Sequence, residues 1–209
     1  MENRFHRYLN LPFEIEQPDI CKEFHDDMKH LDINDYTDEK VVAWLHKLGL
    51  CVSHTEVFYT PPNGGKLPIH SDETTLDDHV KINVTWGPEE GVMRWWKTNK
   101  TQVFTDIEDV KANYKDVAVD SADEFSHRQH TNVLALEEDC TLMYEANTNK
   151  PSLVNVGVLH STYNPTQQGR WTLCFVVGIP NGHGYVYWDE ALEYFKDYIA
   201  GERYDNEGR

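Results

Sequence analysis

Three side chains in this sequence are of the types that bind a divalent metal, and a fourth can hold an acid beside it. His70 and Asp72 form a His-x-Asp pair, and His160 ends a distant apolar run. Two imidazoles and one carboxylate make a facial triad, which binds Fe(II) and leaves coordination positions open for substrate and O2. Arg170 follows His160 by ten positions. Its planar guanidinium suits the far carboxylate of a dicarboxylic co-substrate.

The His-x-Asp pattern is informative only in its context. It occurs three times, at His25, His30 and His70. The first two lie in the charged stretch 23–35, which we interpret as solvated surface. His70 instead follows apolar runs and a Pro-Pro-Asn-Gly-Gly turn, a pattern that predicts a strand end. Residues two apart in a strand share a face, so His70 and Asp72 would point into one cavity.

The segment around His160 predicts the other half of the site. The apolar residues before His160 alternate as in a strand, and a turn precedes Arg170. Folding the two strands as a β-hairpin places His160 opposite Arg170 and Val158 opposite Thr172. Directly opposed residues share a face, so His160, Arg170 and Thr172 would look into the interior that holds the metal. The alternative is a purely structural role, in which these inward polar groups need other compensation.

Length, charge and cysteine usage limit the class of protein. A chain of 209 residues suits one domain with a sizeable core. The net charge of -17 argues against a nucleic-acid partner and against anionic membranes. No apolar stretch is long enough to span a bilayer, and the N-terminus lacks the apolar core of a signal peptide. The four scattered cysteines indicate reduced thiols, so we expect a cytoplasmic protein.

Helical patterns flank a strand-rich centre. We expect a single domain, 1–209, with a helical or irregular N-terminal extension (1–50), a β core (51–180) and a closing C-terminal helix (181–209). The clearest helix begins near Asp38 and stops at Gly49. The core contains an irregular insert at about 87–135, with a strand at 92–96, a short helix at 106–114 and a polar loop at 116–129. Strands return at 140–144 and 153–180, and an amphipathic helix is expected at 188–200. This order predicts a mainly β protein built as a small barrel with flanking helices.

At the four candidate site residues the sequence resembles the Fe(II)- and 2-oxoglutarate-dependent dioxygenases. The subgroup it resembles most is the aspartyl/asparaginyl β-hydroxylase-like branch, which includes free-proline hydroxylases. The likeness covers roughly residues 51–180. It implies a double-stranded β-helix (a cupin-like jelly roll), with iron bound by His70, Asp72 and His160. It also implies that Arg170 binds the C5 carboxylate of 2-oxoglutarate.

The family uses a further polar residue for the C1 carboxylate of 2-oxoglutarate, and the candidates here are Tyr59, Asn83 and Thr172. The resemblance implies hydroxylation of a small-molecule or peptide substrate, an amino acid or a peptide side chain, with release of succinate and CO2. Trp95 and Trp96 could contact the substrate, although packing is the commoner role of such residues. Two other functions stay open. One is a cupin-type metalloenzyme that does not use 2-oxoglutarate, and the other is a non-catalytic jelly-roll binding module.

Overall fold

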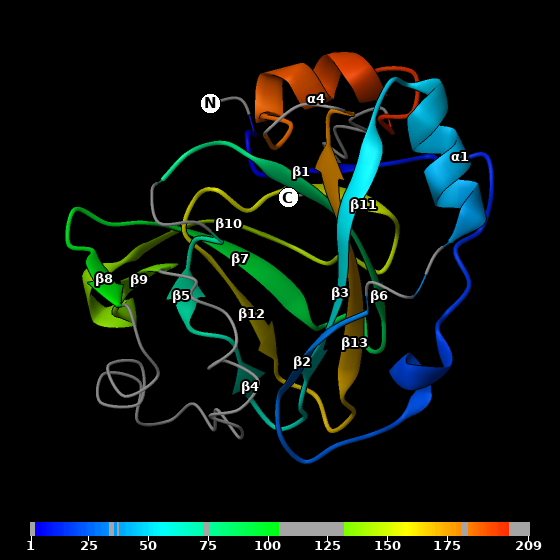
Figure 1. Ribbon diagram of the computed structural model, residues 1–209. Helices are drawn as coiled ribbons and strands as arrows, with labels where there is room; N and C mark the ends of the chain where they lie inside the picture. Colours follow the sequence, from blue (N-terminus) through cyan, green and yellow to red (C-terminus); the bar gives the residue numbers. More distant parts are fainter. Residues whose placement is uncertain are drawn as a thin grey trace, which may run out of the picture.

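The structure of the chain is a computed structural model, and it describes residues 3–33, 36, 38–72, 76–104, 132–180 and 184–200. Two antiparallel β-sheets form a sandwich, and two short helices cover the outer side of one of them (Figure 1). The mainly β, jelly-roll-like fold class predicted from the sequence is therefore confirmed. None of the helices in the described ranges is both long and apolar enough to cross a membrane.

The first sheet carries the core that the helices cover. Its strands are β1 (His6–Tyr8), β2 (Lys29–Asp32), β3 (Cys51–Thr60), β6 (Val80–Trp86), β11 (Ser152–Asn155) and β13 (Arg170–Gly178). They lie in the order β1–β11–β6–β13–β3–β2. The central strand β13 pairs with both β3 and β6, so Arg170 lies beside Thr60 and Thr172 beside Thr85.

The second sheet supplies both candidate histidine ligands. Its strands are β4 (Gly65–Lys66), β5 (Ile69–His70), β7 (Val92–Lys97), β8 (Gln102–Phe104), β9 (Asn132–Ala135), β10 (Thr141–Ala146) and β12 (His160–Asn164). Six of them follow the order β10–β7–β12–β5–β9–β8, and β4 pairs with β12. His160 lies opposite His70 on one side and opposite Trp95 on the other. The inner face of this sheet therefore brings the two imidazoles side by side.

The helices α1 (Glu39–Lys47) and α4 (Trp188–Phe195) pack on the outer face of the first sheet. The carboxylate of Asp38 accepts hydrogen bonds from two backbone N–H groups of the first turn, which caps α1 as predicted. Gly49 ends this helix in the left-handed region, with φ of 77°. Short 3-10 helices occupy Asp19–Lys22 and Glu137–Asp139. The predicted closing helix is too long, because Ile199 forms a β-bridge with Leu9 instead.

Two predictions about strands are wrong. The N-terminal extension is not simply helical or irregular, since β1 and β2 form the two edges of the first sheet. The strands β12 and β13 do not form a hairpin, because they belong to different sheets and the turn between them crosses the sandwich. The strand expected at 92–96 is confirmed as β7. The helix expected at 106–114 and the loop at 116–129 lie outside the described residues.

Candidate active site

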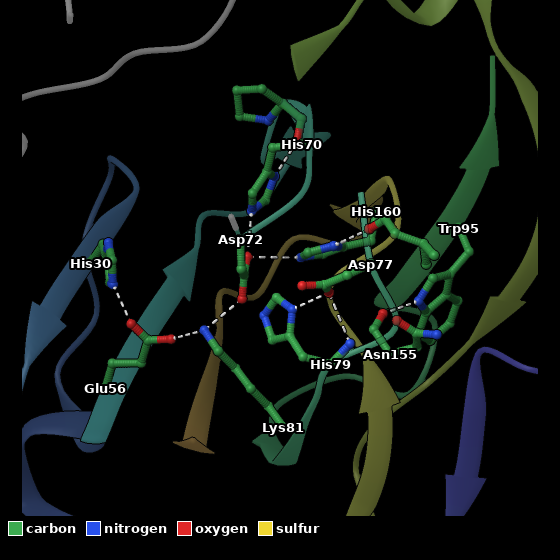
Figure 2. A network of polar contacts seen from close by, with 12 residues as sticks. His30, Glu56, His70, Asp72, Asp77, His79, Lys81, Trp95, Asn155 and His160 are labelled. Atoms are coloured by element: carbon green, nitrogen blue, oxygen red, sulfur yellow. Dashed lines mark hydrogen bonds and ion pairs between the residues drawn. The ribbon is translucent and has the colours of Figure 1, made fainter. Parts of the chain in front are cut away.

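The three candidate metal ligands converge between the two sheets (Figure 2). His70 ends β5, Asp72 follows it in the next loop, and His160 begins β12. The Nε2 atoms of His70 and His160 lie 3.3 and 3.4 Å from Oδ1 of Asp72. One ligand atom from each residue lies within 4.8 Å of the others, so a single cation can contact all three. Their side chains are 13, 16 and 6 % exposed for His70, Asp72 and His160, so the site is recessed but open to solvent.

Both imidazoles are held in the tautomer that a metal needs. Nδ1 of His70 lies 2.8 Å from the carbonyl oxygen of Pro68, and Nδ1 of His160 lies 3.0 Å from that of Val158. A carbonyl oxygen can only accept, so each Nδ1 donates a hydrogen and each neutral ring turns an Nε2 lone pair toward Asp72. Burial, reinforced by the neighbouring His70, lowers the pKa of His160 despite the nearby Asp72 carboxylate. In these tautomers two ring nitrogens and a carboxylate oxygen face one another, an arrangement that a metal cation would satisfy.

The second oxygen of the candidate ligand Asp72 contacts a buried lysine from the opposite sheet. Oδ2 of Asp72 lies 2.5 Å from Nζ of Lys81, and the same ammonium contacts Glu56 (Figure 2). Glu56 in turn lies 3.0 Å from Nε2 of His30. His30 is not simple solvated surface as predicted, because it belongs to β2 and its ring stacks on Phe58 at 4.1 Å.

These buried charges stabilise one another. Burial favours the neutral form of each group, yet Lys81 holds the pKa of both Asp72 and Glu56 well below the ordinary range. The two carboxylates in turn raise the pKa of Lys81 in spite of its burial. Asp72, Glu56 and Lys81 are therefore ionised at neutral pH, and they link the loop that contains Asp72 to the first sheet.

Arg170 is buried with part of its hydrogen-bonding capacity unused. Its Nη2 donates to the Thr148 hydroxyl at 3.3 Å, whereas Nε and Nη1 have no partner among the described residues. Burial lowers the pKa of Arg170 to about 10, which leaves the guanidinium charged at neutral pH. The hydroxyl of Thr85 joins those of Thr148 and Thr172 at 2.7 and 2.8 Å. A buried cation with two free donors beside hydroxyl groups is suited to a carboxylate.

Arg170 faces the interior that contains the triad. It lies opposite Thr60 in the first sheet, and the Thr60 hydroxyl is 3.3 Å from the hydroxyl of Thr162 in β12. Thr162 comes two residues after His160, a step of about 7 Å along a strand. Arg170 and His160 thus lie on the facing sides of the two sheets, and they are not opposite each other in a hairpin as predicted.

The three candidates for the C1 carboxylate fall on two different faces. Thr172 and Asn83 point toward the interior, and the buried Oδ1 of Asn83 has no partner among the described residues. Tyr59 lies on the opposite face of β3, where its ring packs on Trp171 at 5.0 Å and borders a separate pocket of about 620 Å³. The structure therefore does not bring Tyr59 to the triad, because neighbouring residues of a strand alternate between faces.

Sequence reasoning missed Lys81, Glu56, Thr85 and Thr148. Alternation along β6 carries the signal for two of them, because Lys81 and Thr85 share a face with the candidate Asn83.

The two tryptophans predicted as either substrate contacts or packing residues lie on opposite faces of β7. Trp95 is fully buried and donates to the carbonyl oxygen of Asn155, which is a packing role. Trp96 lies on the other face of β7 and donates to Ser161.

No family model and no curated protein matches this sequence. Among solved structures, EvdMO1 is similar at 12% identity with a TM-score of 0.40, over 72% of this chain and 35% of EvdMO1. HygX from Streptomyces hygroscopicus, solved with nickel and 2-oxoglutarate, is similar at 14% identity with a TM-score of 0.40, over 78% of this chain and 80% of HygX. EvdO2 from Micromonospora carbonacea var. aurantiaca, complexed with 2-oxoglutarate, is similar at 11% identity with a TM-score of 0.37, over 73% of this chain and 69% of EvdO2. The chain thus spans about a third of the length of EvdMO1. These similarities are distant, so the chemistry of this chain is inferred from its own residues.

Proposed function

We propose that this protein is an Fe(II)- and 2-oxoglutarate-dependent oxygenase that hydroxylates an amino acid or a peptide side chain, releasing succinate and CO2. One observation carries the proposal. Two imidazole lone pairs and a carboxylate oxygen converge on one point, and a buried arginine with two unused donors faces the same interior. The Nε and Nη1 atoms of Arg170 have no partner among the described residues.

His70, Asp72 and His160 would hold the iron. They supply two nitrogen ligands and one oxygen ligand, the set typical of non-haem Fe(II) oxygenases. The carbonyl groups of Pro68 and Val158 keep the two rings oriented through Nδ1, as outer contacts of metal-bound histidines generally do.

Arg170 would hold the far carboxylate of 2-oxoglutarate. The unused N–H groups of Nε and Nη1 can donate to a carboxylate, and a carboxylate bound by two guanidinium nitrogens is fixed in both position and orientation. The hydroxyls of Thr148 and Thr172 lie close enough to the guanidinium region to contribute further hydrogen bonds. Asn83 or Thr172 remains the candidate for the C1 end.

Iron would supply the oxidative decarboxylation of 2-oxoglutarate and the coupled oxidation of a substrate C–H bond. The chain itself positions the reactants and excludes water. The charge of Arg170 would orient the co-substrate. The inward apolar side chains of Met93, Trp95 and Val154 form a buried cluster that excludes water from this part of the sandwich. Where water is excluded, the local dielectric constant is low and ionic contacts are stronger.

Succinate formation tests the proposal. Protein purified anaerobically is mixed with Fe(II) and 2-oxoglutarate, and O2 is then admitted. We expect succinate from the wild-type protein even without the natural substrate, loss of it in His70→Ala, and retention in His46→Ala, whose histidine is exposed on α1. Absence of turnover in the wild type, together with unchanged iron affinity in His70→Ala, would defeat the proposal.

The two open functions are outcomes of related measurements. A cupin-type enzyme that does not use 2-oxoglutarate is favoured if Arg170→Ala leaves 2-oxoglutarate binding and metal-dependent turnover unchanged. A non-catalytic binding module is favoured if elemental analysis finds no stoichiometric metal in protein incubated with Fe(II) under anaerobic conditions.

A further inference from the structure

Lys81 reaches from one sheet to the metal-binding loop of the other. It lies in β6 of the first sheet, whereas Asp72 follows β5 of the second. Its Nζ contacts Asp72 through Oδ2 at 2.5 Å, while Oδ1 faces His70 and His160. The two carboxylate oxygens of Asp72 therefore have different partners.

This division matters because a carboxylate can bind a metal through one oxygen or through both. A triad aspartate that chelated with both oxygens would occupy one of the positions that a facial triad leaves open. An ammonium group seated on Oδ2 competes directly with a metal for that oxygen. Oδ1 is then the oxygen left for the cation.

Glu56 holds Lys81 in this place from the other side. The ammonium contacts Glu56, and Glu56 is itself backed by His30 at 3.0 Å and His54 at 3.6 Å. The lysine side chain is 9 % exposed, so its stem has little room to swing away from Asp72. Removing Lys81 alone would leave Glu56 as an uncompensated buried charge, which is strongly destabilising.

We propose that Lys81 is a positioning residue that restricts Asp72 to coordination through a single oxygen and so keeps an additional metal position open for the co-substrate. The inference rests on the metal centre of the proposed function. It concerns the number of open positions, which is measurable without turnover.

Bound Mn(II) is the probe, because water proton relaxation counts the exchangeable waters on this ion. The test variant is Lys81→Met combined with Glu56→Gln, which removes one positive and one negative buried charge together. The control is Glu56→Gln alone, which keeps the contact between Lys81 and Asp72. Lys81→Arg is the conservative variant, since it keeps the positive charge beside Glu56 and can still donate to Oδ2.

We expect about three exchangeable waters on Mn(II) in the wild type, in Glu56→Gln and in Lys81→Arg, because three protein ligands leave three octahedral positions. The double variant should bind Mn(II) with about one water fewer and bind 2-oxoglutarate roughly 10-fold more weakly or worse. An unchanged water count and unchanged 2-oxoglutarate affinity in the double variant would overturn the inference while leaving the proposed function intact.

The wild-type measurement decides the matter even if the double variant does not fold. About two waters on Mn(II) in the wild type would show that Asp72 chelates through both oxygens in spite of Lys81, which overturns the inference. No Mn(II) binding at all would overturn the proposed function and this inference together. A count of about three supports both.

Discussion

Two glycines determine where the Arg170 guanidinium can lie. A Cβ at Gly91 would come within 2.6 Å of Cδ and 2.8 Å of Nη1 of Arg170, and a Cβ at Gly87 would come within 2.6 Å of its Cβ. Both glycines belong to the turn between β6 and β7. The absence of side chains there lets the turn close over the arginine and keeps its free donors in the interior.

Gly91→Ala should therefore weaken 2-oxoglutarate binding by displacing the guanidinium. We expect about tenfold weaker binding, equivalent to about 1.4 kcal/mol, because overpacking at a buried site typically costs this much or more. Isothermal titration of the Mn(II)-loaded protein measures the effect. Gly184→Ala is the matched control, since a Cβ there meets nothing within 4 Å. Equal affinity in the two variants would show that the position of Arg170 does not matter for the co-substrate.

Arg170→Lys tests the geometry of the guanidinium separately from its charge. Lysine keeps a positive charge but cannot offer the planar set of guanidinium donors. We expect the dissociation constant of 2-oxoglutarate to rise by about 30-fold or more, the cost of disrupting a buried charged pair. Mn(II) affinity should stay at the wild-type level, because the metal ligands are on the other sheet. A variant that binds 2-oxoglutarate normally would argue that another residue holds its far carboxylate.

At the scale of elements, local patterns predicted where helices and strands lie better than they predicted which strands pair. The cap at Asp38 and the stop at Gly49 define α1, and both signals lie within a few residues of the helix ends. The supposed hairpin failed because the turn after β12 leads into the facing sheet, and only packing of the whole sandwich decides that. The inward orientation of His160 and Arg170 was nevertheless predictable, because alternation along a strand does not depend on which strand it pairs with.

Leu45→Ala should separate the stability of the sandwich from the integrity of the site. Leu45 of α1 is fully buried against the outer face of the first sheet. Its truncation should lower the free energy of unfolding by about 2–5 kcal/mol, as measured by urea denaturation. Lys47→Ala on the exposed side of α1 should change it by less than about 0.5 kcal/mol. Mn(II) affinity of the folded Leu45→Ala protein should equal that of the wild type, and a large loss would contradict the separation of the two faces.

The β1 edge of the first sheet should make the protein sensitive to acid. His6 is buried, its Nε2 lies 3.1 Å from the Ser152 hydroxyl, and burial together with Arg7 lowers the pKa of His6 to about 4. An unfolded histidine titrates near pH 6.5, so between about pH 6.5 and pH 4 the unfolded chain binds a proton that the folded chain does not. Stability should fall as the pH drops through this window, by about 3 kcal/mol in total.

His6→Gln should reduce that dependence. The free energy of unfolding of the two proteins is compared by urea denaturation at pH 8 and pH 5. The difference at pH 8 gives the effect of the substitution itself, and we expect the wild type to lose more stability than the variant on going to pH 5. An equal loss in both proteins would show that His6 does not carry this sensitivity.

At the scale of the whole molecule, the site depends on residues far apart in the sequence. The His-x-Asp pair, His160 and Arg170 were identifiable from residue type, spacing and alternation. Thr148 was not, because a threonine outside the strands carries no chemical signature until the sheets are packed around it, and for Lys81 only the alternation along β6 gave a signal. The large negative charge of the chain, -17, gave no indication that its most buried cations would lie at the site.

Metal binding should stabilise the fold as a whole. A ligand that binds only the folded state at 100 times its dissociation constant adds about 2.7 kcal/mol to the free energy of unfolding. Calorimetry with and without Mn(II) should show a corresponding rise in Tm for the wild type and for His46→Ala. The rise should be absent at the same Mn(II) concentration in His160→Ala. A comparable rise in His160→Ala would place the ion elsewhere on this acidic protein.

The candidate metal ligands come from strands β5 and β12 of one sheet and the loop after β5, whereas Arg170 and Thr172 come from the other sheet. In the proposed function, the ion and the organic acid would thus be bound mainly by different sheets. Substitutions in β13, and in β6 away from Lys81, would then alter the length or charge of the acid that is accepted and leave the ion in place. Redesign of this protein for a different diacid would accordingly begin with those two strands and keep β5 and β12 untouched.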